Sequence, residues 1–196
     1  LSKTFLGALF TFGVIYYVLT QEMITEETIF RSAVMAAQKS TNTTLYDTKY
    51  DFSVYKDKIE TLSFENYNLK SIPMQVFELE NLKTLDLSNN NLTSLPSDIA
   101  KLKNLTALSL GDNHLTNLPN ELFKLKNLKI LHLGSNNLAN LPANIAKLKK
   151  LIILNIADND LTNLPADIAK LNNLTTLKVG ANHLTDLPNE IGKLKN

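Results

Sequence analysis

One pattern of apolar residues repeats every 23 residues through the C-terminal part of this chain. The six copies span residues 59–196 and begin at Ile59, Leu82, Leu105, Leu128, Leu151 and Leu174. If the first residue of a copy is repeat position 0, apolar residues recur at positions 0, 3, 5, 10, 13, 17 and 20. A unit this short cannot bury its own leucines, so neighbouring copies must stack into a solenoid.

Each copy contains the pattern of a short strand followed by a turn. In the second copy, Leu85 and Leu87 alternate with Thr84 and Asp86, which is the period of a half-buried strand. All six prolines occupy position 14, where a fixed φ and a missing N–H suit the start of a short helical turn. The sequence therefore predicts an α/β solenoid, curved, with parallel strands on the concave side and helical turns on the convex side.

An asparagine occupies position 8 of every copy except the first, where Tyr67 replaces it. At this point the chain turns away from the strand. A buried Asn there is expected to bond backbone groups of its own turn and of the neighbouring coil. A terminal copy has no preceding coil to bond, which accounts for Tyr67. The asparagines are Asn90, Asn113, Asn136, Asn159 and Asn182.

The N-terminal segment has a different composition, with a 17-residue apolar run at residues 4–20 that contains no charge. Seventeen residues is about the shortest helix that spans a bilayer. Residues 22–39 contain neither Pro nor Gly, so the pattern predicts one long transmembrane helix with an amphipathic extension over about residues 4–38. A cleaved signal peptide or a buried soluble helix gives a similar run, although no small-x-small cleavage site follows this one.

Two features of this segment bear on its packing and orientation. Gly7 and Thr11 form a small-xxx-small pair, which permits close helix packing and also occurs by chance. Lys3 precedes the apolar run, and acidic residues follow it at Glu22, Glu26 and Glu27. The positive-inside tendency then predicts a cytoplasmic N-terminus and extracytoplasmic repeats, in the periplasm or at the cell surface.

The composition divides the chain into three parts, at residues 1–39, 40–58 and 59–196. Of 14 Phe and Tyr residues, 13 lie at or before Phe77. The aromatic residues of 40–58 are expected to cap the first repeat, with an aromatic substrate site as the alternative. At the other end, Ile191 and Leu194 have no atypical cap after them, so further repeats, a cap or another protein are expected to cover them.

Charge and residue types argue against catalysis and nucleic-acid binding. Twenty basic and 19 acidic residues are interspersed, so no basic stripe forms. Cysteine is absent, which excludes thiol catalysis and thiolate metal sites. His114 and His183 lie three copies apart, and His132 has no nucleophile to complete a site. The sequence predicts no enzyme activity, cofactor, metal or small-molecule substrate, and a solvated lysine row at position 19 in preference to a phosphate site.

The unit LxxLxLxxNxLxxLPxxIxxLxN resembles the 23-residue class of leucine-rich repeats, found in bacterial surface proteins and in Ras-pathway scaffolds. The resemblance covers about 70% of the chain and implies protein binding on the concave face. That face lacks Trp, Tyr and Arg, the usual anchors of tight interfaces, so weak or avidity-dependent binding is expected. The candidate partner-binding residues are Asp86, Ser109, Ile130, His132, Ile153, Asn155 and Lys178.

Together these features predict a membrane-anchored leucine-rich-repeat module for protein–protein interaction. The first hypothesis is a structural accessory subunit of a larger membrane complex, docked through the N-terminal helix. The alternative is a freestanding surface receptor or adhesin that binds a ligand on the concave face.

Overall fold

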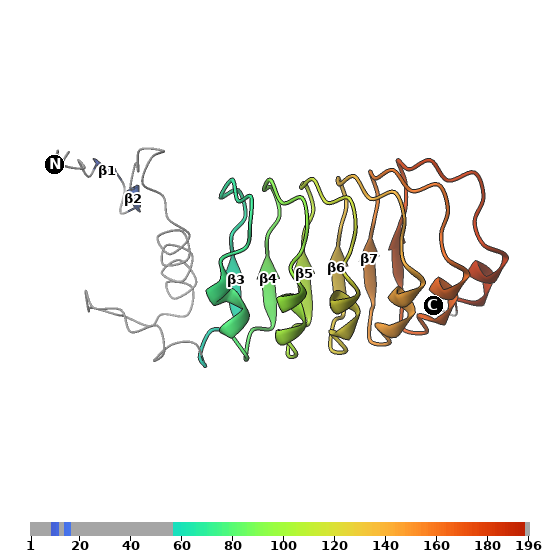
Figure 1. Cartoon of the computed structure of the whole chain (residues 1–196), viewed down its shortest axis with the longest axis horizontal. Helices are drawn as coiled ribbons and strands as arrows, with labels where there is room; N and C mark the ends of the chain where they lie inside the picture. The colour runs from blue at the N-terminus through green and yellow to red at the C-terminus, as the bar shows by residue number, and fades with distance from the viewer. Residues whose placement is uncertain (1–8, 12–13, 17–56, 195–196) are drawn as a thin grey trace.

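The computed structural model describes residues 9–11, 14–16 and 57–194 of the chain. Residues 57–194 form six stacked repeats, each with one strand of three residues and one 3₁₀-helix of five (Figure 1). The strands are β3 (Thr61–Ser63), β4 (Thr84–Asp86), β5 (Ala107–Ser109), β6 (Ile130–His132), β7 (Ile153–Asn155) and β8 (Thr176–Lys178). The 3₁₀-helices are η2 (Met74–Glu78), η3 (Ser97–Lys101), η4 (Asn120–Lys124), η5 (Ala143–Lys147), η6 (Ala166–Lys170) and η7 (Asn189–Lys193).

The six strands pair in parallel and in chain order, which confirms the predicted solenoid. Each strand meets the same repeat positions of the next, so that Leu108 pairs with Leu131 and Leu131 with Leu154. The strands line one side of the array, and the 3₁₀-helices lie on the other (Figure 1). Because the register shifts by 23 residues from strand to strand, each strand leucine stacks on the equivalent leucine of the next repeat.

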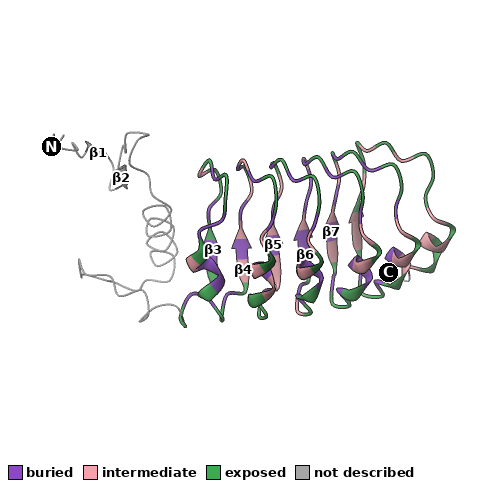
Figure 2. Ribbon diagram, viewed as in Figure 1, coloured by how far each residue is buried: buried purple, intermediate pink, exposed green. Residues whose placement is uncertain are grey.

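The leucines of the pattern form one continuous core, and buried positions recur along the ribbon from one repeat to the next (Figure 2). Phe64, Leu131 and Ile145 are fully inaccessible to solvent. In the last described repeat, by contrast, Leu177 and Ile191 are only partly buried against the core, and Leu187 is 51% exposed. The apolar residues of the last described repeat are therefore less buried than those of the repeats before it.

Each 3₁₀-helix begins directly after the proline at position 14, as the sequence predicts. Pro96 supplies its carbonyl, which accepts a bond from the Ile99 N–H at 3.2 Å, and the Ile99 carbonyl accepts the next from Leu102. Proline has no N–H to lose at this position, while its fixed φ starts the turn. The same pattern, Val76 to Pro73 and Ile145 to Pro142, recurs along the array.

The turn after each strand requires a left-handed backbone at repeat position 7. The φ values there lie between 51° and 62°, a region that Asn and Asp tolerate much better than other residues with a side chain. All six repeats adopt this conformation; four have Asn or Asp at the position, and the other two have Ser and Ala. The residues are Asn66, Asn89, Asp112, Ser135, Asp158 and Ala181.

Replacing Ser135 with Asn is therefore expected to stabilise the array. The gain should be about 0.5–1 kcal/mol, because Asn adopts the left-handed conformation at lower cost. The reciprocal change, Asn89→Ala, should lose a similar amount. Urea unfolding followed by circular dichroism measures both. Equal midpoints for Ser135→Asn and the unchanged protein would contradict the assignment of strain to this position.

The predicted helix near the N-terminus is wrong for the residues that the structure describes there. β1 (Leu9–Thr11) and β2 (Val14–Tyr16) are strands, paired antiparallel with Leu9 opposite Tyr16 and Thr11 opposite Val14. β-Branched and aromatic residues favour strands, and an apolar run without periodicity does not distinguish a strand from a buried helix. Since Thr11 lies in β1, the predicted helix-packing pair of Gly7 and Thr11 is also not supported.

The other predictions for the N-terminal part fall on residues 1–8, 12–13 and 17–56, which lie outside the described residues. These include the amphipathic extension of the helix and the aromatic cap. Among residues 9–11, 14–16 and 57–194, no helix combines the length and hydropathy needed to cross a bilayer.

Candidate functional site

The asparagines at position 8 hold the turns that shape the concave face. The Asn90 amide donates to the carbonyls of Phe64 at 2.8 Å and of Leu87 and Ser88 at 3.0 Å. Its Oδ1 accepts the Leu69 N–H at 2.8 Å. Each Asn thus links its own turn to the preceding repeat, and the predicted role is confirmed.

The later repeats keep the same four bonds, and the first repeat lacks them. Asn136, for example, accepts from the Leu115 N–H at 2.9 Å and donates to the carbonyls of Leu110, Leu133 and Gly134. Tyr67 instead packs edge-on against Phe64, with ring centroids 5.8 Å apart. Because the bonds run to the preceding repeat, an aromatic contact in the first repeat agrees with its terminal position.

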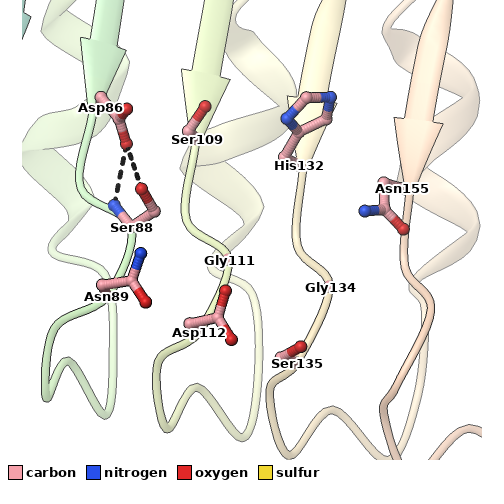
Figure 3. Close-up of a pocket in the computed structure, with 10 residues that line it drawn as sticks. All are labelled: Asp86, Ser88, Asn89, Ser109, Gly111, Asp112, His132, Gly134, Ser135 and Asn155. Atoms are coloured by element: carbon pink, nitrogen blue, oxygen red, sulfur yellow. Dashed lines mark hydrogen bonds between the residues drawn. The ribbon is translucent and has the colours of Figure 1, made fainter. Parts of the chain in front are cut away.

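Four consecutive repeats enclose a polar hollow of about 330 Å³ at the C-terminal ends of β4 to β7 (Figure 3). One rim is the last residue of each strand, and the other rim is the left-handed turn. Small residues at position 6 lie between the two rims and leave the space open. The lining residues are Asp86, Ser88, Asn89, Ser109, Gly111, Asp112, His132, Gly134, Ser135 and Asn155.

Some polar groups of the strand-end rim are fixed by local hydrogen bonds. The Asp86 Oδ1 accepts from the Ser88 N–H at 3.0 Å and from the Ser88 hydroxyl at 2.6 Å (Figure 3). The Asn155 Oδ1 likewise accepts from the Ala157 N–H at 3.1 Å. These bonds orient the side chains before any partner arrives, which lowers the entropy cost of binding.

Negative charge predominates on the concave face. Repeat positions 2, 4, 6 and 7 carry one lysine, Lys178, and four carboxylates, those of Glu65, Asp86, Asp112 and Asp158. The ion pairs found in residues 57–194 lie elsewhere, such as those of Lys101 with Asp98 and Lys124 with Glu121. Within that range, Asp86, Asp112 and Asp158 take part in no salt bridge.

The structure brings together four of the seven predicted partner-binding residues. Asp86, Ser109, His132 and Asn155 line the hollow. Ile130 and Ile153 are half-buried and pair in register at the start of β6 and β7. They lie two residues before His132 and Asn155, which line the hollow. Lys178 is exposed at the end of β8, outside the lining. Their role in binding stays a prediction.

The turn rim and the floor of the hollow consist of residues that are absent from the predicted list of partner-binding residues. Six residues contribute them, because the strand ends after position 4 and the following turn brings positions 6 and 7 to the same side. The signal in the sequence is a small residue at position 6 followed by Asn, Asp or Ser at position 7. The residues are Ser88, Asn89, Gly111, Asp112, Gly134 and Ser135.

The lysines of the helical side make structural contacts. Lys126 Nζ donates to the Phe123 carbonyl at 2.8 Å and to the Lys147 carbonyl of the next repeat at 3.3 Å. Partial burial, and then the charges of Lys147 and Lys149, lower the pKa of Lys126. Lys149 bonds the Lys170 carbonyl in the same way. These lysines link the ends of successive 3₁₀-helices.

No group of three or more histidine, aspartate or glutamate side chains in the described residues converges to hold a metal ion. Among residues 57–194, the closest approach of a histidine to a carboxylate is between His183 Nε2 and Asp160 Oδ1, at 3.7 Å, and both side chains are more than half exposed. His132 lies on the strand-end rim beside Ser109 and Asn155 (Figure 3).

Comparison with known proteins places residues 57–196 in one family. Residues 57–115 match a leucine rich repeat model, and residues 105–196 match a leucine-rich repeat region model. A leucine-rich-repeat protein of Leptospira interrogans is similar in structure, with 38% identity and a TM-score of 0.63 over 65% of this chain. An internalin of Listeria monocytogenes has 32% identity and a TM-score of 0.58 over 64% of this chain.

The match covers only 32% and 36% of those two structures, so this chain spans about a third of their length. No curated protein shows a significant similarity to the sequence. Both family models and both solved structures are of leucine-rich repeats, and the sheet has the 23-residue register that such repeats require. The chain is a leucine-rich-repeat protein.

Proposed function

We propose that the repeats bind another protein and that the concave face is the binding surface. The observation that carries this proposal is the hollow, because one continuous polar surface is built from four consecutive repeats. The fold supports it as well, since stacked repeats create extended concave surfaces that suit binding. The core leucines point away from this face, so its side chains are free to serve recognition.

The composition of the face favours contact over many small residues. Its columns contain no Trp, Tyr or Arg, the residues that dominate most hot spots. Affinity must then come from charge, from the Ile130–Ile153 pair and from the area covered. Several binding sites used together would raise the apparent affinity, as multivalency does.

Photo-crosslinking tests which face binds. Benzoylphenylalanine is introduced at Ser109, on the concave rim, and in a matched variant at Lys147, which is exposed on the helical side. In the native cells, irradiation of the Ser109 variant should give one discrete adduct that the Lys147 variant lacks. Adducts from Lys147 alone would move the binding surface to the convex side and overturn the proposal.

A second proposal concerns attachment to a membrane as an accessory subunit of a larger complex. It is supported by the 17 uncharged apolar residues at 4–20. To cross a bilayer this segment would have to become helical in lipid, since one pair of strands leaves backbone groups unbonded there. The proposed orientation, with a cytoplasmic N-terminus and extracytoplasmic repeats, follows from Lys3 and the acidic residues after the run.

Membrane attachment is tested by carbonate extraction and by purification in mild detergent. The full chain should stay in the membrane pellet and carry integral membrane partners in fixed stoichiometry. These partners should be lost when residues 4–38 are replaced by an unrelated anchor. A chain recovered alone from the membrane, whose concave face still binds an external ligand, would favour the receptor or adhesin instead.

A further inference from the structure

We propose that the concave face docks a basic, extended segment of its partner protein. In this arrangement a lysine or arginine side chain enters the hollow, and an aliphatic side chain packs on Ile130 and Ile153. The inference rests on the proposed function and names the chemistry of the partner. Its first support is charge complementarity across the whole sheet face.

The charge argument concerns carboxylates that have no cation near them. Asp86 and Asp112 contribute to opposite rims of the hollow, and no Lys or Arg is among the lining residues. One Asp86 oxygen already accepts two bonds from Ser88, which fixes the carboxylate and leaves its second oxygen available. Fixed carboxylates beside hydroxyl and amide groups suit an ammonium or guanidinium, which has donors and no acceptors.

The size of the hollow limits what enters it. Its volume of about 330 Å³ is at the lower end of the range for small-ligand pockets, which fits one long side chain. Gly111 and Gly134 keep it open. A Cβ at Gly111 would lie 3.4 Å from the Gly134 carbonyl oxygen, in ordinary contact, whereas a Cβ at Gly180 would meet nothing within 4 Å.

The second support is the apolar pair at the other end of the same strands. Ile130 and Ile153 pair across β6 and β7, two residues before His132 and Asn155. Two strand residues span roughly 6.6 Å, and an extended ligand presents residues i and i+2 on one face with the same spacing. An aliphatic residue on the isoleucines therefore places a basic residue two positions away at the rim of the hollow.

The test uses the full chain labelled with ¹⁵N-glycine, which gives at most six amide signals. Gly111 and Gly134 report on the hollow, and Gly180 and Gly192 serve as internal controls in the last repeat. The probe is the tripeptide acetyl-Leu-Ser-Arg-amide at neutral pH. We expect saturable shifts of Gly111 and Gly134, with a Kd on the order of 1–10 mM, and no shift of Gly180 or Gly192.

Matched probes and variants identify the two contacts. Citrulline in place of arginine removes the charge with little change in shape and should raise the Kd at least about tenfold. Glycine in place of leucine should raise it about threefold or more. Asp86→Asn with Asp112→Asn should raise it about tenfold, because asparagine suits the turn at Asp112, while the exposed Asp186→Asn leaves it unchanged. In the Gly111→Val variant the tripeptide should no longer shift the Gly134 amide signal, whereas in the Gly180→Val variant the shift should remain.

Three results would overturn the inference: no saturable shift, equal shifts with the citrulline probe, or binding that survives the double aspartate substitution. These results leave the proposed function intact if Ser109 still crosslinks to a partner. A partner captured only from Lys147, with the arginine probe still bound in the hollow, would overturn the proposed binding surface and leave the affinity of the hollow for a basic side chain intact.

Discussion

Leu131→Asp should abolish the cooperative folding of the array. Leu131 is completely buried in β6, in register with Leu108 and Leu154. A carboxylate there has no partner, and an unpaired buried charge costs several kcal/mol even after it takes up a proton. That cost is comparable to the whole stability of a typical domain. We expect a reduced far-UV signal and loss of the single cooperative thermal transition.

The position of the substitution determines how the damage spreads. A repeat contacts only its neighbours, so a solenoid broken in the middle is divided into two short arrays. Hydrogen exchange should show fast exchange in β5 to β7. The adjacent His132→Asp is the matched control, because position 132 faces the hollow and should change stability by less than about 0.5 kcal/mol. A Leu131→Asp protein with an unchanged melting temperature would contradict the proposed core.

The repeat part of the fold could be predicted because one constraint acts six times. Each leucine of the unit has to be buried by a neighbour, and the fixed spacing leaves one way to stack the copies. Short parallel strands on the concave side, helical turns after each proline and bonded asparagines at position 8 all follow from this spacing. The structure confirms each of them.

Local backbone geometry was harder to predict than the repeat. The strand ends at position 4, which the alternation of leucines does not mark, and the left-handed turn at position 7 follows from that end. A second asparagine ladder at position 22 was also missed. Asn104 and Asn127 donate to the carbonyls of Glu80 and Lys103 in the preceding repeat. Exposed side chains of this kind carry no hydrophobic periodicity that would reveal their bonds.

The predicted helix fails at residues 9–11 and 14–16 for a different reason. An apolar run has no internal alternation to separate strand from helix, so length and absence of charge were the only guides. β1 and β2 include Phe10, Val14 and Ile15, residues that favour strands. The repeats escape this ambiguity because polar residues interrupt the leucines at fixed positions.

Asn136→Ala should lower the free energy of unfolding by about 3–4 kcal/mol. The substitution removes four hydrogen bonds inside the array and leaves the buried Leu115 N–H without its acceptor. Each lost bond costs about 1 kcal/mol, and a buried unsatisfied group costs more. Asn137→Ala is the control, because Asn137 is the exposed neighbour and its change should cost less than about 0.5 kcal/mol. Equal urea midpoints for the two variants would contradict the structural role.

Asn136→Asp separates hydrogen bonding from packing, because aspartate has nearly the same shape. Its carboxylate would keep an acceptor for Leu115 but would face the carbonyls of Leu110, Leu133 and Gly134 without donors. Burial and these carbonyls raise the pKa of such a group above its usual value. The folded state then binds a proton more readily than the unfolded state, so stability should rise as pH falls through the raised pKa.

The Asn136→Ala protein provides the reference, since it has no group to titrate at this position. If both variants show the same pH dependence between about pH 4 and pH 8, the amide of Asn136 acts through packing and not through its three donated bonds.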